Sequence, residues 1–178
     1  MGGNLTSHIG DPAVTLKSAL STLNGVNLTV TKVSRFFRTP CFPAGAGPDF
    51  VNAAALVESE LSAPEILARL HEVEAAFGRE RKSRWAGRTL DIDLIGGEDL
   101  ILPDRATHEA WRDLPLEDQM QKAPEQLILP HPRLQDRAFV LVPLNDVAPG
   151  WIHPILGRSV AEMLSDLPES EREAVVPM

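Results

Sequence analysis

The spacing of hydrophobic positions along the chain predicts three amphipathic helices. Apolar residues recur at helical intervals over residues 12–23, 63–77 and 160–167, so each segment can turn one apolar stripe towards a core. Residues that favour a helix start precede each segment, and residues that favour a helix end follow it. These start and end residues are Asp11 and Asn24, Ser62 and Gly78, and Ser159 and Pro168.

Three further segments have the pattern of β-strands. Residues 28–37 and 50–57 are rich in Thr, Val, Phe and Ala, and we expect them to pair as antiparallel neighbours. The connection between them, about a dozen residues with three prolines and two glycines, exceeds an ordinary hairpin turn and is typical of a functional loop. Over residues 89–94 apolar and acidic residues alternate, which predicts a strand with one buried face.

The order of these elements predicts an α+β fold with helices on one face of an antiparallel sheet. Residues 1–10 begin with Gly-Gly-Asn after Met1, a sequence that favours a turn. We therefore expect no strand before the first helix. Beyond the last helix we expect the tail to fray.

The composition is that of one globular domain over residues 1–178. Hydrophobic residues make up 43% of the chain and charged residues 24%, both ordinary values for a globular protein, and the length suits a single domain. The segment 97–129 differs, because eight acidic residues outnumber three basic ones and apolar residues are sparse. We interpret it as an acidic insertion with a short surface helix formed by Trp111, Leu114, Leu116 and Met120.

The remaining bulk properties restrict the compartment and the partners. A single cysteine excludes an internal disulfide and any zinc site made of several cysteines. No apolar run is long enough to span a bilayer, and the net charge of −8 argues against nucleic acid as the main partner. We expect a cytoplasmic monomer with no membrane partner and no nucleic-acid partner.

A cluster of basic residues followed by two aspartates is the strongest chemical signal. Five basic residues lie within positions 79–88, and Asp91 and Asp93 follow on one face of the predicted strand. Two carboxylates on one face suit a hard cation such as Mg²⁺, and guanidinium groups match phosphate oxygens. Together they favour a nucleoside triphosphate site, although each half alone is more typical of a solvated surface.

Aromatic and amide side chains offer a second recognition element. Phe42 lies in the proline-rich connection, and Phe50 and Asn52 share one face of the strand that follows it. An aromatic ring beside an amide can recognise a flat heterocycle. On the second helix His71 and Glu74 are three residues apart, and a solvated polar pair is the simpler interpretation there.

Taken together, the motifs resemble the 6-hydroxymethyl-7,8-dihydropterin pyrophosphokinase family of folate biosynthesis. The resemblance implies a ferredoxin-like antiparallel sheet packed with helices, with the family's first strand missing. It also implies transfer of the β,γ-diphosphate of ATP to the hydroxymethyl group of the reduced pterin, with release of AMP. The segments that resemble the family, in its order, are GGNL, SRFFRTP, PDFVNAA, HEVEAAFGRER, RWAGRTLDIDLI and LPHPRLQDRAFVLVPL.

The resemblance further implies roles for individual residues. Two Mg²⁺ ions would be held by Asp91 and Asp93, with ATP as co-substrate. The implied catalytic residues are Arg79, Arg88, Asp91 and Asp93. The implied ATP-binding residues are His71, Glu74, Arg81, Trp85, His131 and Arg137. The implied pterin-binding residues are Thr39, Pro40, Phe42, Phe50, Asn52 and Phe139.

Two other interpretations remain open at the level of sequence. The arginine cluster together with Trp85 would also suit a module that binds nucleic acid. A chain that lacks the family's first strand could instead be a truncated, inactive relative that acts as a binding protein.

Overall fold

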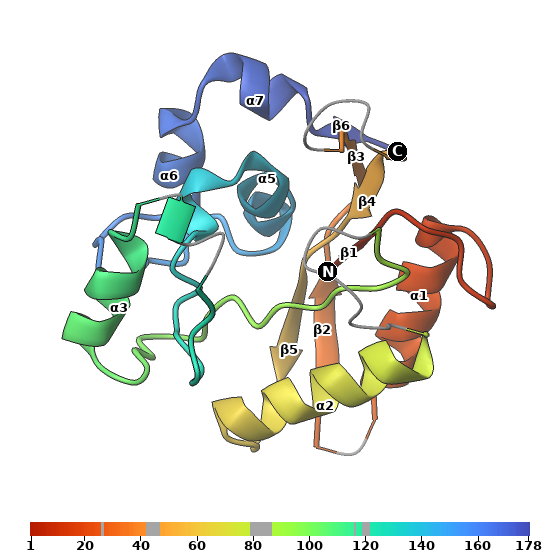
Figure 1. Ribbon diagram of the computed structural model, residues 1–178, viewed down its shortest axis with the longest axis horizontal. Coiled ribbons are helices and arrows are strands. Elements are labelled where there is room, and N and C mark those ends of the chain that lie inside the picture. The colour runs from red at the N-terminus through yellow and green to blue at the C-terminus, as the bar shows by residue number, and fades with distance from the viewer. Residues whose placement is uncertain (26, 42–46, 79–86, 116, 119–121) are drawn as a thin grey trace.

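The computed structural model describes residues 1–178 except 26, 42–46, 79–86, 116 and 119–121 (Figure 1). Its described strands form one antiparallel sheet of order β1-β4-β3-β6 and a second antiparallel sheet of β2 and β5. The strands are β1 (Gly2–Gly3), β2 (Thr29–Val33), β3 (Phe37–Thr39), β4 (Phe50–Asn52), β5 (Ala55–Glu58) and β6 (Val176–Pro177). The helices are α1 (Pro12–Leu23), α2 (Ala63–Ala76), α3 (Arg105–Arg112), the 3-10 helix η1 (Leu134–Asp136), α5 (Ala138–Val147), α6 (Val160–Asp166) and α7 (Glu169–Glu173).

The three helices predicted from the sequence form as α1, α2 and α6, each with its predicted N-terminal cap. The Asp11 carboxylate accepts a 2.9 Å hydrogen bond from the Val14 amide. The capping boxes of α2 and α6 are both complete, so backbone amides of the first turn are satisfied locally. At the end of α2, Gly78 adopts φ +79°, which a residue with a side chain adopts only with strain.

The two predicted strands of the hairpin pair as antiparallel neighbours, but each is divided in two. On one side of the break β2 pairs with β5. On the other side β3 pairs with β4, with Thr39 opposite Phe50. At the break the Ser34 hydroxyl accepts a 2.9 Å hydrogen bond from the Ala54 amide. A side chain thereby replaces a backbone partner in the ladder.

The first residues of the chain form a strand, so the expectation of a turn and of no strand before the first helix is wrong. Gly2 pairs with Asn52 of β4 on one side and with Asp91 on the other. Glycine suits positions 2 and 3 because atoms of neighbouring segments approach the backbone closely. A Cβ on Gly2 would lie 2.4 Å from Asn52 Oδ1, and one on Gly3 would lie 2.5 Å from the Thr89 carbonyl oxygen.

Residues 89–94 form a single bridge pair at Asp91 rather than the full strand predicted. The alternation of burial is nevertheless as expected. Leu90 and Ile92 are 0% and 6% exposed, whereas Asp91 is half-buried and Asp93 is exposed. The two carboxylates therefore lie on the side away from the core.

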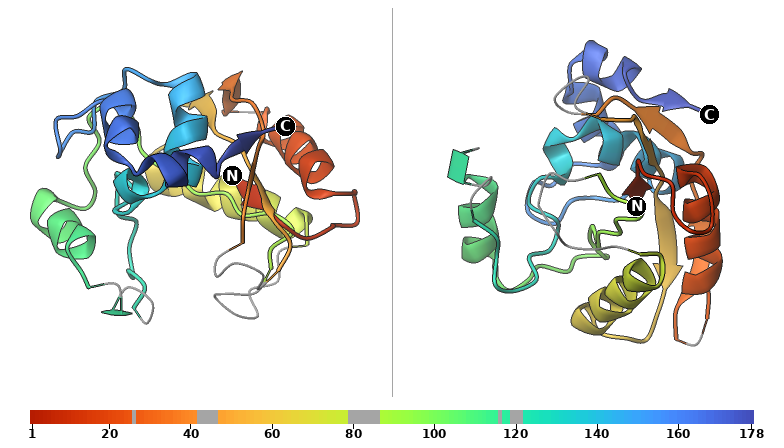
Figure 2. Two further views of the ribbon diagram at one scale, coloured as in Figure 1. Left: turned by 90° about the horizontal axis from the view of Figure 1, so that it is seen from above. Right: turned by 45° about the vertical axis from the view of Figure 1, so that its right-hand side comes forward.

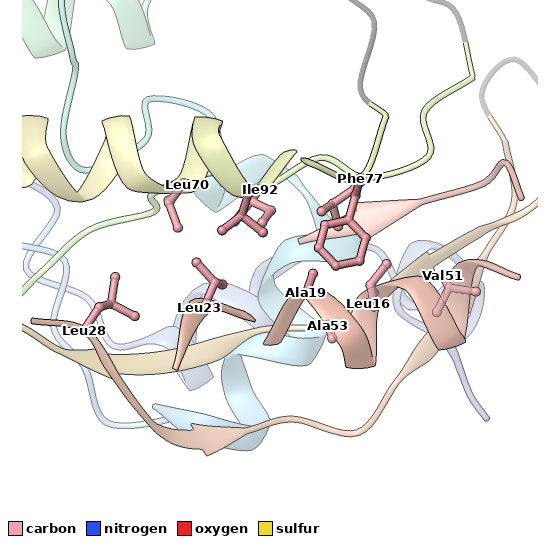
Figure 3. Packing of buried hydrophobic residues seen from close by; sticks show 11 residues of the cluster. Leu16, Ala19, Leu23, Leu28, Val51, Ala53, Leu70, Phe77 and Ile92 are labelled. Carbon is pink, nitrogen blue, oxygen red and sulfur yellow. The ribbon is translucent and has the colours of Figure 1, made fainter. Parts of the chain in front are cut away.

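Helices pack on both faces of the strands, and the prediction of helices on one face is wrong. Along β5 successive side chains alternate, with Val57 against the core of α1 and α2 and Leu56 against the core of α5 and α6. Figure 3 shows the first core, where Phe77 at the end of α2 lies beside Leu16 of α1 and Leu70 lies earlier in α2, towards Leu23 and Leu28. The second core depends on α5, a helix that the uninterrupted apolar run at 138–144 did not reveal.

The C-terminal residues are ordered into α7 and β6, so the prediction of a frayed tail is wrong. Val175 is buried against Phe37 and Ala138. Beyond it β6 pairs with β3, with Pro177 opposite Phe37. The tail thus completes one edge of the larger sheet.

The acidic segment contains α3, capped by a 2.9 Å hydrogen bond from the Thr107 amide to Asp104 Oδ1. The short helix expected around Trp111, Leu114, Leu116 and Met120 overlaps α3 only at Trp111, and Leu116 and Met120 lie outside the described residues. Figures 1 and 2 show α3 at the end of the molecule away from α1. No helix in the described part of the chain is long and apolar enough to cross a membrane.

Candidate active site

The backbone that carries Asp91 and Asp93 is held in place by hydrogen bonds to two different elements. The Asp91 amide and carbonyl each make a 2.8 Å hydrogen bond with the backbone of Gly2. One residue on, the Ile92 amide donates a 2.6 Å hydrogen bond to Glu74 Oε1, and Glu74 is 1% exposed. With Leu90 also in the core, this acidic pair has a rigid support.

Arg88 is held three residues before Asp91 by the side chain and backbone of Asn4. The Arg88 amide donates a 2.9 Å hydrogen bond to Asn4 Oδ1, and its carbonyl accepts one of 2.9 Å from the Asn4 amide. The Arg88 guanidinium forms an ion pair with Asp91 through Nη1 and Oδ2. A cation and a carboxylate are thus already paired at this position.

Asn4 also contacts the loop between β3 and β4 and so links it to the segment that carries Arg88. Its Nδ2 donates a 3.1 Å hydrogen bond to the carbonyl of Pro48, and the side chain is buried. Asn4 is not among the predicted site residues, although it lies in the GGNL motif that resembles the family.

His131 and Arg137 lie close enough to Asp93 to interact with its charge. Burial lowers the pKa of His131, Asp93 opposes this, and Arg137 lowers the pKa further. Burial likewise lowers the pKa of the Arg137 guanidinium, and Asp93 again opposes the change. The His131 Nδ1 atom accepts a 3.1 Å hydrogen bond from the Arg133 amide, so the neutral ring carries its proton on Nε2 and can donate from there.

Three of the predicted pterin-binding residues come together on β3 and β4. Asn52 Nδ2 donates a 2.7 Å hydrogen bond to Thr39 Oγ1, and both residues are buried. Phe50 lies opposite Thr39 in the register. Pro40 follows β3 and is exposed.

Phe139 comes from another element, the first turn of α5, and is 43% exposed. Its ring centroid lies 5.7 Å from the guanidinium carbon of Arg137, a cation–π distance. The helix α5 that carries Phe139 packs on both β3 and β4.

The other predicted site residues are placed as follows. His71 is exposed on α2, one turn before Glu74, whose side chain instead points into the core. The predicted site residues Phe42, Arg79, Arg81 and Trp85 lie outside the described residues.

A rigid acidic pair beside arginine and histidine on an α+β fold is an arrangement suited to phosphoryl transfer, the chemistry of the phosphotransferase class. Comparison with protein families makes the assignment specific, because the profile of the 7,8-dihydro-6-hydroxymethylpterin-pyrophosphokinase (HPPK) family matches residues 1–149. The chain therefore belongs to this family. The prediction of a pyrophosphokinase of folate biosynthesis is confirmed.

Similarity to curated relatives extends over most of the chain. A protein of Synechocystis sp. is 33% identical over 168 residues, which cover 94% of this chain and 73% of the relative. One of Methylorubrum extorquens is 34% identical over 172 residues, covering 96% and 95%. One of Haemophilus influenzae is 32% identical over 155 residues, covering 86% and 82%. Each is named 2-amino-4-hydroxy-6-hydroxymethyldihydropteridine pyrophosphokinase.

Proposed function

We propose that the chain transfers the β,γ-diphosphate of ATP to the hydroxymethyl group of 6-hydroxymethyl-7,8-dihydropterin, giving the pterin diphosphate and AMP. The observation that supports this most directly is the acidic pair Asp91 and Asp93, fixed by Gly2 and Glu74. Transfer of a phosphoryl group needs positioning and charge stabilisation rather than a covalent nucleophile. A rigid pair of carboxylates beside cationic side chains meets that need.

We further propose that Asp91 and Asp93 hold two Mg²⁺ ions. The donor set fits, because both side chains offer carboxylate oxygens on the face away from the core and Asp93 is exposed. When bound, the ions neutralise charge on the phosphate oxygens and so favour attack at phosphorus.

The cationic residues would bind the phosphates of ATP. Asp91 orients the Arg88 guanidinium, and the five N–H donors of a guanidinium allow one side chain to serve Asp91 and a phosphate oxygen together. His131 would donate from Nε2 as a neutral ring, and Arg137 would add positive charge beside Asp93. Roles in ATP binding or catalysis are also proposed for His71, Arg79, Arg81 and Trp85, and Glu74 would contribute by fixing the backbone between the two aspartates.

The pterin would be held at the ends of β3 and β4. Asn52 and Thr39 place amide and hydroxyl groups in one hydrogen-bonded pair, which suits the donors and acceptors of a pterin edge. Rings of Phe50 and Phe139, from β4 and α5, would stack on the heterocycle. Pro40 and Phe42, in the connection after β3, would complete this side of the site.

We also propose that the fold is ferredoxin-like and forms a single domain over residues 1–178. The support is the sheet order, in which Asp91 pairs with β1, β1 with β4, and β4 with β3, while α1 and α2 make the crossovers. A monomeric state and a cytoplasmic location stay predictions.

Replacement of the two aspartates tests the proposal. Asp91→Asn and Asp93→Asn should each lower AMP formation from ATP, Mg²⁺ and 6-hydroxymethyl-7,8-dihydropterin by about 100-fold or more, since charge stabilisation of this kind contributes that much. Asp99→Asn, an exposed site in the acidic segment, is the matched control and should keep full activity. Unchanged rates in both active-site variants would refute the metal site. A wild-type protein that binds both substrates but forms no AMP would instead identify an inactive binding protein.

A further inference from the structure

Two buried histidines lie next to one another outside the residues assigned to the reaction. His108 belongs to α3 in the acidic segment, and His153 lies in the loop before α6. Both are 0% exposed, and their ring centroids are 5.8 Å apart at an interplanar angle of 72°. His108 is thus a buried histidine in a segment to which no role has been assigned.

Hydrogen bonding fixes the protonation of both rings. Nδ1 of His153 accepts from the Ile155 and Leu156 amides at 3.2 and 3.3 Å, so its proton lies on Nε2. Nε2 of His108 lies 3.0 Å from the carbonyl oxygen of Pro130, which can only accept, so this nitrogen must be the donor. Burial lowers the pKa of both histidines, and both rings are therefore neutral at pH 7.

The His108 contact is made one residue before a proposed ATP-binding residue. Pro130 is followed by His131, whose amide donates a 2.7 Å hydrogen bond to the Ile95 carbonyl. The peptide group between Pro130 and His131 is therefore held at both ends, its oxygen by His108 and its N–H by Ile95. Rotation of that group would displace the His131 ring.

The acidic segment is attached to the rest of the chain by further contacts around this one. Within the segment, Leu102 and Leu129 form a bridge with hydrogen bonds of 2.9 and 3.1 Å, which closes the segment on itself. The Arg105 guanidinium donates a 3.3 Å hydrogen bond to the Pro154 carbonyl, next to His153. The Trp151 indole N–H donates to the Glu98 carbonyl at 3.0 Å. The segment is therefore closed by its own bridge and joined to residues 151–154 by hydrogen bonds before and within α3.

We propose that His108 is a positioning residue for the pyrophosphokinase reaction, which fixes the Pro130 carbonyl through its Nε2–H and so orients His131 towards ATP. The inference rests on the proposed ATP contact of His131. It makes the acidic segment 97–129 a structural part of the nucleotide site. Small displacements of a substrate-binding group have large effects on rate, so the loss of one such hydrogen bond should be measurable in ATP binding.

Two substitutions at position 108 separate the hydrogen bond from packing. His108→Phe keeps a ring of similar size but has no donor, and should raise the KM for ATP roughly tenfold, the effect expected of one lost hydrogen bond. The KM for the pterin should stay within about twofold. His108→Gln, whose amide N–H can occupy the place of Nε2–H, should restore most of the ATP affinity. Glu109→Gln, on the same helix, is the control and should change neither KM.

His131→Ala distinguishes failure of this inference from failure of the proposed function. If His131→Ala raises the KM for ATP and His108→Phe does not, the positioning role is refuted while the ATP contact stands. If His131→Ala leaves the KM for ATP unchanged, the proposed contact and the inference both fall. In the double variant, His108→Phe should add little to the effect of His131→Ala, because both act through one ring.

A measurement on the unmodified protein covers the case in which His108→Phe does not fold. The ¹⁵N NMR spectrum of histidine-labelled protein at pH 7 should show His108 and His153 as neutral rings with the proton on Nε2. A His108 ring with its proton on Nδ1 would exclude the hydrogen bond to Pro130 and refute the proposal.

Discussion

The buried carboxylate of Glu74 accepts a 2.6 Å hydrogen bond from the backbone amide of Ile92. Ile92 separates Asp91 from Asp93, so this contact ties the centre of the acidic pair to α2. The sequence resemblance implied that Glu74 contacts ATP. Its position in the structure instead favours an indirect role, in which Glu74 fixes the backbone that carries the two aspartates.

Glu74→Ala should therefore lower both stability and activity. It leaves a buried amide without a partner, which costs about 1–3 kcal/mol of unfolding free energy, and it releases the acidic pair from α2. Glu74→Gln retains an acceptor oxygen and should preserve most of the stability. Urea unfolding and AMP formation measure the two effects.

The matched control for Glu74 is Glu72→Ala on the same helix. Glu72 pairs with Arg69 at 2.7 Å on the exposed surface, where such a pair contributes about 0–1 kcal/mol. A Glu74→Ala protein with wild-type stability and a raised KM for ATP would contradict the supporting role and favour direct contact with the nucleotide.

The helices with local signals could be predicted from the sequence, and so could the acidic pair. Asp11 and Ser62 cap helices through bonds within a few residues, and alternation at 89–94 is visible in a short window. In contrast, β1 and α5 depend on distant contacts. Gly2 is a strand residue because Asn52 and Asp91 approach it from either side, and nothing within residues 1–10 reveals those neighbours.

Gly3→Ala should destabilise the protein much more than Gly97→Ala. A Cβ on Gly3 would lie 2.5 Å from the Thr89 carbonyl oxygen, a backbone atom, whereas one on Gly97 would have nothing within 4 Å. We expect Gly3→Ala to lose about 2 kcal/mol or more, as in other overpacked sites, which corresponds to a fall in Tm of about 4–8 °C. Gly97→Ala should be neutral or slightly stabilising. Equal Tm values for the two variants, measured by thermal unfolding, would show that the β1 contacts are looser than described.

Asn4→Ala should impair the site at two places. The side chain accepts from the Arg88 amide at 2.9 Å and donates to the Pro48 carbonyl at 3.1 Å, so its loss frees both the segment before Asp91 and the end of the β3–β4 connection. Two buried hydrogen bonds at about 1 kcal/mol each correspond to roughly a 30-fold fall in kcat/KM. Steady-state kinetics with each substrate measures it.

Asn4→Asp separates the two contacts of Asn4. It keeps an acceptor for Arg88 but places a second oxygen against the Pro48 carbonyl, so it should affect the pterin more than ATP. A variant with kcat/KM within twofold of wild type for both substrates would show that Asn4 is not needed to organise the site.

The buried histidines could not be recognised from the sequence as residues that support the site. Asp91, Thr39 and Asn52 lie in motifs that resemble the family, so their roles could be proposed from sequence. His108 lies in the acidic segment, outside those motifs, and its environment is set by Pro130 and by His153, which follows 45 positions later. A histidine in a short helix of a polar, acidic segment would ordinarily be taken as solvated.

The buried histidines should also make stability depend on pH. The pKa of His153 is lowered from 6.5 to about 4, mainly by burial and to a smaller extent by the charges of His108 and Arg112. Between these values the unfolded chain binds a proton that the folded chain does not. The stabilisation is therefore present above pH 6.5 and is lost as the pH falls towards 4. At 1.36 kcal/mol per pH unit it amounts to about 3 kcal/mol.

Urea unfolding at pH 7, 5.5 and 4.5 tests this expectation. His153→Phe removes the titrating ring and should flatten the dependence between pH 6.5 and 4.5, whatever its effect on stability at pH 7. His8→Gln, at an exposed position, is the matched control and should keep the dependence of the wild type. Because burial lowers the pKa of His108 and His131 in the same direction, part of the slope should remain in His153→Phe. Parallel curves for His153→Phe and wild type would show that His153 is protonated as readily in the folded chain as in the unfolded one.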